Sequence, residues 1–214
     1  MSESKLDLKK RAVIEVAEEL FLSEGLAATE MKEIAHRSSI SRSTLYRMFE
    51  SRETLAFSVA DKCLHELFGF KPLDIYGTDK SGFEILRAYS NDLVETMIEK
   101  VRYLKYLSEF DQMFSGDYPD TPEARTYMEF NRQRHDRQML LDILRMGVAD
   151  GSIRGDIDAN MLELAIGNTI LGVAQRILTR EKNYQKEYGY GREILYNVME
   201  LMLEGVRSKN VKNG

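Results

Sequence analysis

The stretch SSISRSTLYRMFESRE, residues 38–53, decides how the N-terminal part of this chain is organised. Leu45 and Phe49 are four residues apart, so both side chains lie on one face of a short helix and can pack on a core. Ser41 stands just before this helix, where its hydroxyl can accept a hydrogen bond from a backbone N–H of the first turn. Ser51 stands in the same relation to the next helical segment. The stretch therefore predicts a turn, a short helix and the start of a longer helix.

The outward face of the short helix carries the residue types that bind nucleic acid. Its members are Arg42, Ser43, Thr44, Tyr46 and Arg47. An arginine can bridge O6 and N7 of guanine, and hydroxyl groups can donate to phosphate oxygens. Arg52 begins the following helix, where free N–H groups and the helix dipole already favour an anion. Lys32, on the preceding helix, could reach into the same groove of DNA.

Charge is distributed unevenly along the chain. The formal net charge is −5 over 214 residues, which argues against indiscriminate nucleic-acid binding. Residues 32–52 nevertheless hold five basic and two acidic side chains. A solvated helix face is the ordinary explanation of such a pattern. The exposed position of Tyr46 and the spacing of the helices favour a DNA-binding surface instead.

Most other segments have the apolar spacing of helices. Residues 8–23 form an apolar face that ends before Gly25, and residues 30–37 follow after Thr29. Two short helices joined by a tight turn, with one helix before them and one after, describe a helix-turn-helix domain. Two glycines and a proline indicate a linker at residues 69–80.

Further helical patterns follow this linker. They cover residues 82–100, 101–115, 122–150, 158–183 and 190–208. The predicted fold is all-α with about nine helices, an N-terminal three-helix helix-turn-helix domain and a C-terminal helical domain. We expect the DNA-binding domain at residues 1–52 and an effector-binding and dimerisation domain at residues 53–214, with a linking helix at about 52–68.

The N-terminal segment resembles the DNA-binding domain of the TetR family of bacterial transcriptional regulators. The resemblance covers residues 11–55, RAVIEVAEELFLSEGLAATEMKEIAHRSSISRSTLYRMFESRETL. The positions that match the family pattern are Ala17, Leu20, Phe21, Gly25, Ile34, Ala35, Ser41, Thr44, Leu45, Tyr46, Phe49 and Leu55. The positions that the resemblance implies to contact phosphates are Thr44, Tyr46 and Arg52. Those that it implies to face bases or the nearby backbone are Arg42, Ser43, Arg47 and, on the preceding helix, Lys32.

The chain departs from the family pattern at several places. Glu30 stands where Thr or Ser is usual, so a helix cap is lost or moves to Thr29. The usual Ala-Gly turn is replaced by two serines, which carries a small strain cost if Ser39 has a positive φ. Met48 stands where an aromatic side chain or a histidine often contacts phosphate, which a methionine cannot do.

The last two helical segments are apolar on most of their circumference. A helix of this kind must be buried on most faces, and in a domain of this size that predicts a subunit partner. The TetR resemblance implies dimerisation through these helices as a four-helix bundle. The predicted interface residues are Ile166, Ile170, Gly172, Val173, Ile177, Leu195, Val198 and Met202. A twofold dimer would place two recognition helices about 34–36 Å apart on a palindromic operator.

The resemblance also implies a small-molecule site among the middle helices. The candidate ligand-binding residues are Tyr89, Tyr106, Phe110, Met113, Tyr127, Phe130, Asn131, Arg134, Asn168 and Gln175. For each aromatic or methionine side chain taken singly, packing in the core is the alternative. For the amides of Asn168 and Gln175, a ligand, a partner subunit and a core hydrogen bond are all open, since a buried amide needs a partner.

No motif indicates an enzyme, a cofactor or a metal site. The residues that most often bind metals, His36, His65, His135 and Cys63, lack ligand spacing. No apolar run approaches the roughly 18–20 residues that span a bilayer, and the N-terminus has no apolar segment behind its charges. We therefore expect a cytoplasmic protein without membrane contact.

Together these patterns predict a repressor that binds a palindromic double-stranded DNA operator as a homodimer. A small apolar or amphipathic effector would release it. One alternative is a DNA-binding regulator that answers a protein partner instead of a small molecule. Another is a helical protein-interaction module in which the helix-turn-helix is only a scaffold. Sequence-preferring DNA binding distinguishes this last alternative from the others.

Overall fold

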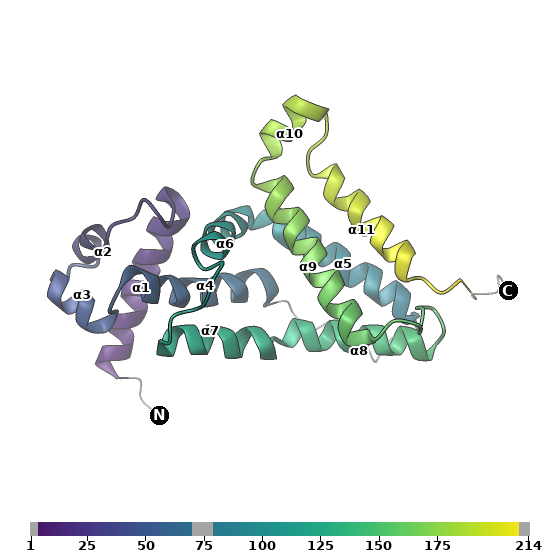
Figure 1. Cartoon of the computed structure of the whole chain (residues 1–214), viewed down its shortest axis with the longest axis horizontal. Helices are drawn as coiled ribbons and strands as arrows, with labels where there is room; N and C mark the ends of the chain where they lie inside the picture. Colours follow the sequence, from purple (N-terminus) through teal and green to yellow (C-terminus); the bar gives the residue numbers. More distant parts are fainter. Residues whose placement is uncertain (1–3, 70–78, 210–214) are drawn as a thin grey trace. The chain divides into compact units, whose positions relative to one another are not determined.

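The computed structural model of the chain describes residues 4–69 and 79–209. These residues form helices joined by loops and a single isolated β-bridge, so the all-α prediction is confirmed (Figure 1). The helices are α1 (Lys5–Glu24), α2 (Met31–Arg37), α3 (Arg42–Met48), α4 (Arg52–Phe68), α5 (Gly82–Glu99), α6 (Val101–Met113), α7 (Pro122–Gln133), α8 (His135–Ala149), α9 (Ala159–Leu178), α10 (Glu181–Tyr188) and α11 (Glu193–Val206). Most of the predicted linker, residues 70–78, lies outside the described residues.

The described residues hold eleven helices, more than the nine or so that the apolar pattern predicted. The pattern over residues 122–150 is interrupted at Arg134, whose φ of −51° and ψ of 132° separate α7 from α8. The additional helix α10 has no buried residue, so no apolar periodicity could indicate it. It ends at Gly189, which adopts the left-handed conformation with φ 75°.

Contacts divide the chain into two compact units. Unit 1 comprises Met1–Glu66 and Lys105–Arg132, and unit 2 comprises Leu67–Leu104 and Gln133–Gly214. Unit 1 thus contains α1 to α3 with most of α4, α6 and α7. The predicted boundary near residue 52 separates a DNA-binding part from an effector-binding part, whereas these two units are defined by contacts alone. The predicted boundary therefore stays a prediction.

Unit 1 begins with a capped helix. The Ser4 hydroxyl accepts a hydrogen bond from the backbone N–H of Asp7 at 3.1 Å, which explains why α1 starts three residues before the predicted residue 8. Gly25 ends α1 with φ 98°, a value that favours glycine. The Glu109 carboxylate of α6 accepts from the Leu26 N–H at 2.7 Å, so the end of α1 is held by a distant helix.

An aromatic cluster joins α4 to α6 and α7 in unit 1. The Phe57 ring centroid lies 4.9 Å from that of Phe110 and 5.6 Å from that of Tyr127. The Tyr106 hydroxyl donates to the backbone carbonyl of Ala56 at 2.7 Å, which satisfies its polar end inside the core. All of these side chains are buried. Burial of such rings contributes about 1.5–3 kcal/mol each and holds the three helices together.

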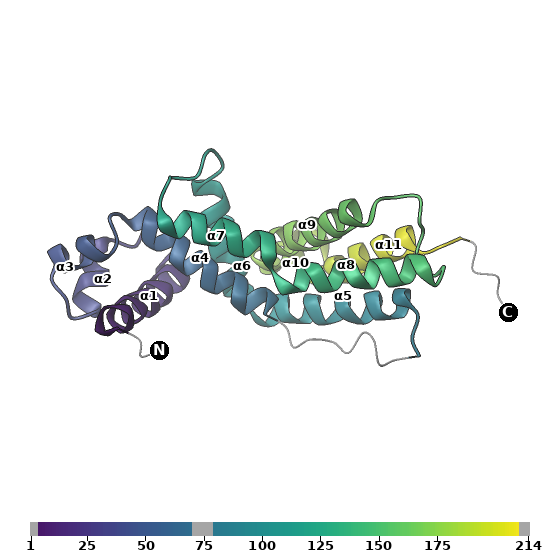
Figure 2. The same cartoon turned by 90° about the horizontal axis from the view of Figure 1, so that it is seen from below.

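Unit 2 is built around α5, which packs along α8, while α9 contacts both α8 and α11. Figure 2 shows α5 and α8 side by side. The two helices approach so closely that a Cβ atom on Gly82 would lie 2.2 Å from the backbone nitrogen of Gly147. Ser81 caps α5 and forms a reciprocal capping box with Glu84. The close packing of α5 on α8 therefore requires glycine at position 82.

Helix α9 bears on the expectation that the protein has no membrane contact. An 18-residue window of this 20-residue helix has a mean hydropathy of 1.2, so the helix is long and apolar enough to cross a membrane by length and composition alone. It is the one such helix in residues 4–69 and 79–209. Polar and charged residues such as Glu163 and Asn168 interrupt the apolar run, so the sequence shows no uninterrupted apolar segment of this length. In unit 2, Glu163 of α9 accepts two hydrogen bonds of 2.8 Å from the Arg137 guanidinium of α8.

Candidate DNA-binding surface

The short helix α3 has two different faces. Leu45 is fully buried, and Met48 and Phe49 are 8% and 2% exposed, so these side chains hold α3 on the core of unit 1. The Phe49 N–H closes the helix by donating to the Leu45 carbonyl at 2.9 Å. Tyr46 lies on the opposite face and is 49% exposed. An exposed tyrosine on a polar face is available for contact with a ligand or a polymer.

The turn before α3 is held by its own backbone and by Ser41. The Ser41 hydroxyl accepts from the Thr44 N–H at 3.2 Å, as predicted for a capping serine. The Ile40 N–H donates to the Ala35 carbonyl at 3.0 Å and fixes the return from α2. Ser39 has φ 54°, so the turn does require the left-handed conformation that glycine adopts at lower cost.

Four of the predicted DNA-binding residues line one surface cavity of unit 1. Its volume is about 470 Å³. The lining residues are Thr29, Glu30, Met31, Lys32, Arg42, Tyr46, Ser51, Arg52 and Glu53. They come from the loop before α2, from α2 itself, from α3 and from the start of α4. The fold thus brings Lys32, Arg42, Tyr46 and Arg52 together from separate elements.

The remaining predicted DNA-binding residues lie on α3 outside this cavity. Ser43 and Arg47 are exposed, and Thr44 is half-buried. The Thr44 hydroxyl lies 2.9 Å from that of Ser41, and the Ser43 hydroxyl lies at the same distance from it. The three hydroxyl groups therefore form a small network at the start of α3, where free backbone N–H groups favour an anion.

The charges in the cavity are partly matched. The Lys32 ammonium lies 2.7 Å from the Glu30 carboxylate, and this hydrogen bond lowers the pKa of Glu30. Arg52 donates to the Ala27 carbonyl at 2.9 Å and lies 3.6 Å from Glu53. The positions of Glu30 and Glu53 beside these cations were not predicted from the sequence. For Glu30 the nearby Lys32 was a signal, but only the folded loop shows that the two side chains meet.

Two departures from the family pattern acquire structural explanations. Glu30 is the residue before α2 and makes no side-chain capping bond, while the Thr29 hydroxyl donates back to the Gly25 carbonyl at 2.8 Å. The cap of α2 is therefore lost and has not moved to Thr29. Met48 is buried, so this position belongs to the core in this chain and not to the outward face.

The predicted ligand-binding residues divide between the two units. In unit 1 they comprise Tyr106, Phe110, Met113, Tyr127, Phe130 and Asn131. Phe110 is fully buried and packs 5.2 Å from Tyr127, within the aromatic cluster described above. The Phe130 ring centroid lies 3.8 Å from that of the His65 imidazole, with the two rings tilted by 34°. Core packing accounts for Tyr106, Phe110 and Tyr127, and their role toward a ligand stays a prediction.

In unit 2, two of the predicted ligand-binding residues belong to a buried polar cluster. Arg134 lies with its guanidinium 3.9 Å from the centre of the Phe68 ring and 3.3 Å from the Asp136 carboxylate. Burial, and after it the negative charge of Asp136, raises the pKa of the Tyr89 hydroxyl. Buried charges of this kind are costly unless they are paired or serve a site.

The two candidate amides of α9 lie elsewhere. Asn168 is exposed, and its amide donates to the Leu164 carbonyl of the same helix at 2.7 Å. Gln175 is half-buried. The position of Asn168 on an open face of α9 favours a partner subunit over a ligand enclosed in unit 2.

The predicted dimer-interface residues divide into buried and accessible members. Ile166, Ile170, Ile177 and Leu195 are at most 4% exposed within unit 2, so they pack in its core. Their role in a dimer stays a prediction. Gly172 is exposed, and the predicted interface residues Val173, Val198 and Met202 are half-buried.

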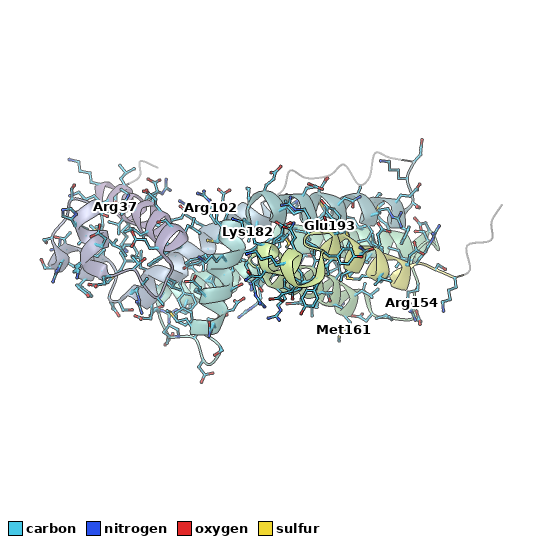
Figure 3. The ribbon with its side chains drawn as sticks, turned by 90° about the horizontal axis from the view of Figure 1, so that it is seen from above. Arg37, Arg102, Arg154, Met161, Lys182 and Glu193 are labelled. Atoms are coloured by element: carbon cyan, nitrogen blue, oxygen red, sulfur yellow. The ribbon has the colours of Figure 1, made fainter. Side chains whose placement is uncertain are left out.

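An exposed apolar stripe lies beside these residues. On α9 it includes Met161 and Leu164, which are 60% and 43% exposed, and on α11 it includes Leu201, which is 75% exposed. Met161 marks the edge of α9 in Figure 3. Side chains of this size on neighbouring helices form the kind of apolar patch that marks a protein interface. We name Met161, Leu164, Gly172, Val198 and Leu201 the α9–α11 stripe.

The glycines of this region have no close neighbours within the chain. A Cβ atom added to Gly167, Gly172 or Gly205 would meet nothing within 4 Å. Glycine in a helix interior costs about 1 kcal/mol relative to alanine. Packing within the described residues does not require these glycines, whereas close approach by another helix would.

Known proteins match this chain at its N-terminal segment and over most of its length. Residues 13–59 match the family described as bacterial regulatory proteins, tetR family. The HTH-type transcriptional repressor KstR2 of Mycolicibacterium smegmatis is 29% identical over 162 residues, which cover 75% of this chain and 75% of the repressor. The matched region of this family includes α2, α3 and all seven predicted DNA-binding residues.

Solved structures share the fold over the whole length. The ketosteroid transcriptional regulator KstR2 of Mycobacterium tuberculosis covers 98% of this chain and 98% of its own, with a TM-score of 0.59 and 20% identity. FadR of Thermus thermophilus, a TetR family transcriptional repressor solved with lauroyl-CoA, covers 96% of this chain and 100% of its own, with a TM-score of 0.61 and 20% identity. At such identities the likeness shows the fold alone.

Proposed function

Because the chain belongs to the TetR family of bacterial transcriptional regulators, we propose that it is a repressor that binds a palindromic operator as a homodimer. A small apolar or amphipathic effector releases it from DNA. The observation that carries the proposal is the division of α3 into a buried face and a basic, hydroxyl-rich face.

In the proposed complex, α3 enters the major groove. Arg42 and Arg47 contact base edges, and Lys32 reaches the same groove from α2. Thr44, Tyr46 and Arg52 contact phosphates, with Ser43 at the nearby backbone. The cavity that joins Lys32, Arg42, Tyr46 and Arg52 supports this assignment, because one short segment of DNA could place a base edge and a phosphate beside side chains from all three helices.

The homodimer is proposed to form through the α9–α11 stripe. Two observations support this choice of surface. Apolar side chains are exposed on α9 and α11, and both helices contain glycines that packing within the chain does not require. A twofold axis between two copies places two α3 helices on successive turns of the operator, about 34–36 Å apart. The palindromic operator follows from this symmetry.

The class of effector follows from the relatives and from unit 2. One relative is a ketosteroid regulator and another was solved with lauroyl-CoA, so bulky apolar or amphipathic molecules are the class to test. Within unit 2, Tyr89 and Arg134 are the predicted contacts that lie in a buried polar cluster. An effector that binds one conformation better shifts the dimer between DNA-competent and DNA-incompetent states.

DNA binding is tested by fluorescence anisotropy with labelled duplexes from the region upstream of the protein's own gene. We expect one duplex to bind more tightly than a scrambled duplex of the same composition, with an affinity that falls as salt rises. Equal, salt-sensitive binding to both duplexes would reduce the proposal to non-specific DNA binding. No binding to either would leave the helix-turn-helix as a scaffold.

The effector is tested in the same assay. Lauroyl-CoA or a ketosteroid is added to the preformed complex, and free coenzyme A serves as the control. Loss of anisotropy with either of the first two, but not with the control, supports release by an apolar or amphipathic molecule. A complex that resists both would point to a protein partner as the signal.

A further inference from the structure

Unit 1 contains a second cavity that shares no residue with the DNA-binding surface. It lies among α1, α4 and α7 and has a volume of about 450 Å³, within the size range of small-molecule sites. The lining residues are Arg11, Ile14, Glu15, Phe57, Ser58, Asp61, Lys62, Pro122, Glu123 and Thr126. We name this cavity the α1–α4–α7 groove.

One wall of the groove is apolar. Phe57 is buried, and its ring packs against the rings of Phe110 and Tyr127 on α6 and α7, so its position is fixed. Ile14 of α1 and Pro122 of α7 complete this wall. Because the Phe57 ring is fully buried, the apolar surface that the groove offers to a hydrocarbon group comes from Ile14 and Pro122.

The charged lining of the groove is predominantly acidic. Its carboxylates are Glu15, Asp61 and Glu123, one from each helix. The Lys62 ammonium is bound by the Glu18 carboxylate of α1, so its charge is already matched. Arg11 is exposed at the α1 side of the groove. The charges that remain favour a positively charged ligand.

Asp61 is the most specific of these carboxylates. Its Oδ1 atom is buried and accepts no hydrogen bond, while its Oδ2 atom lies 3.9 Å from the His65 imidazole, too far for a hydrogen bond. Burial raises the pKa of this carboxyl group. The Asp61 side chain is still 29% exposed, so a ligand ammonium group can meet its carboxylate at the accessible side and offset the cost of this partly buried charge.

We propose that the α1–α4–α7 groove binds a small amphipathic organic cation, with its ammonium group at Asp61 and its hydrocarbon part against Ile14 and Pro122. Glu15 and Glu123 add to the attraction from the neighbouring helices. A ligand in this position joins α1 to α7 and stabilises unit 1 by mass action. The site stands independently of DNA binding and of the effector proposed for unit 2.

The test uses 2-phenylethylammonium as the probe and isothermal titration calorimetry of the full chain at about 150 mM salt, where long-range attraction is screened. We expect saturable binding to the wild-type protein. The neutral 2-phenylethanol and the anionic 3-phenylpropionate should bind at least tenfold more weakly. Asp61→Asn should weaken the binding of 2-phenylethylammonium at least tenfold, because the amide removes the charge with little change in size.

Two further variants make the result decisive. Asp92→Asn removes an exposed carboxylate of α5, outside the groove, and should bind the probe as the wild type does. Thr126→Arg places a long cationic side chain at an exposed position of the groove and should abolish binding without disturbing the core. The proposal is overturned if the wild type does not bind the probe, or if Thr126→Arg binds it unchanged. Equal loss of binding in Asp92→Asn and Asp61→Asn would also overturn it.

Discussion

Ser39 shows how a single residue limits the stability of the turn between α2 and α3. Its φ of 54° lies in the left-handed region, which costs an ordinary L-residue about 1–2 kcal/mol. The turn needs this conformation because the Ile40 N–H must return to the Ala35 carbonyl. Ser38, one residue earlier, has an ordinary φ of −79°. Replacement by glycine should therefore change the stability of the protein in opposite directions at the two serines.

Ser39→Gly should stabilise the protein by about 0.5–1 kcal/mol, because glycine adopts a positive φ without a steric cost. Ser38→Gly is the matched control and should destabilise it by a similar amount, since it only adds freedom to the unfolded chain. Urea unfolding, followed by circular dichroism, measures both. A Ser39→Gly variant less stable than the wild type would contradict this account of the turn.

The three arginines of the proposed DNA-binding surface should differ in effect. Arg42→Ala and Arg47→Ala remove proposed base contacts, so each should cost about 1–3 kcal/mol on the preferred duplex and reduce its advantage over a scrambled duplex. Arg52→Ala removes a proposed phosphate contact. It should weaken binding to both duplexes alike and lower the slope of log K against log salt by about one.

Anisotropy titrations at several salt concentrations separate these outcomes. Arg52 also donates to the Ala27 carbonyl, so the folding of Arg52→Ala is checked first by its melting temperature. Arg37→Ala is the matched control, since Arg37 is an exposed arginine of α2 paired with Glu19 at 2.9 Å. Unchanged affinity in all three test variants would rule out the proposed docking of α3.

At the scale of elements, α9 and α11 each have an inner and an outer apolar face. Ile166 and Ile170 pack inside unit 2, while Leu164 and Leu201 remain exposed. A helix that is apolar on both faces gains stability from burial on both, and one copy of the chain can bury only one of them. The outer face is therefore the surface proposed for a partner subunit, and a Cβ atom on its glycines would meet no atom of the chain within 4 Å.

Leu201→Glu should convert the dimer into a monomer, because a twofold interface would bring two carboxylates together in an apolar contact. Gly172→Glu should do the same by blocking the approach of the partner helix. Leu8→Glu on α1 is the control, since Leu8 is 53% exposed and lies outside the α9–α11 stripe. Multi-angle light scattering reports the mass of each variant. A dimeric Leu201→Glu variant would exclude this stripe as the interface.

At the scale of the whole molecule, the boundaries between the two compact units fall inside α4, α6 and α7. The chain enters unit 2 after Glu66, returns to unit 1 at Lys105 and leaves it again after Arg132. Each unit therefore depends on segments that are distant in sequence. The predicted ligand-binding residues follow this division, with the aromatic members concentrated in unit 1 and Tyr89 and Arg134 in unit 2.

Dimer formation should couple stability to protein concentration. If the α9–α11 stripe is buried in a dimer, the melting temperature should rise with concentration, because association stabilises only the folded state. Scanning calorimetry over a hundredfold range of concentration measures this rise. The Leu201→Glu variant should melt at a lower temperature that does not change with concentration. A wild-type melting temperature independent of concentration would argue against an obligate dimer.

Local sequence patterns were enough to predict the helices of the N-terminal segment and the buried face of α3. The spacing of Leu45 and Phe49, the capping Ser41 and Ser51, and the basic residues between 32 and 52 predicted α3, its buried face and the start of α4. These features depend on contacts within about one helical turn, so they can be read from neighbouring residues. The same pattern predicted the exposed positions of Arg42, Tyr46 and Arg47.

Only the tertiary structure decided which apolar faces are inside. Ile166 and Leu201 have the same character in sequence, yet one is buried in unit 2 and the other is exposed. The sequence showed only that a positive φ at Ser39 would carry a strain cost, and the structure shows that φ is positive there. The groove at Asp61 arises where α1, α4 and α7 meet, from residues more than a hundred positions apart. Contacts between distant segments set burial and charge pairing, and local periodicity carries no information about them.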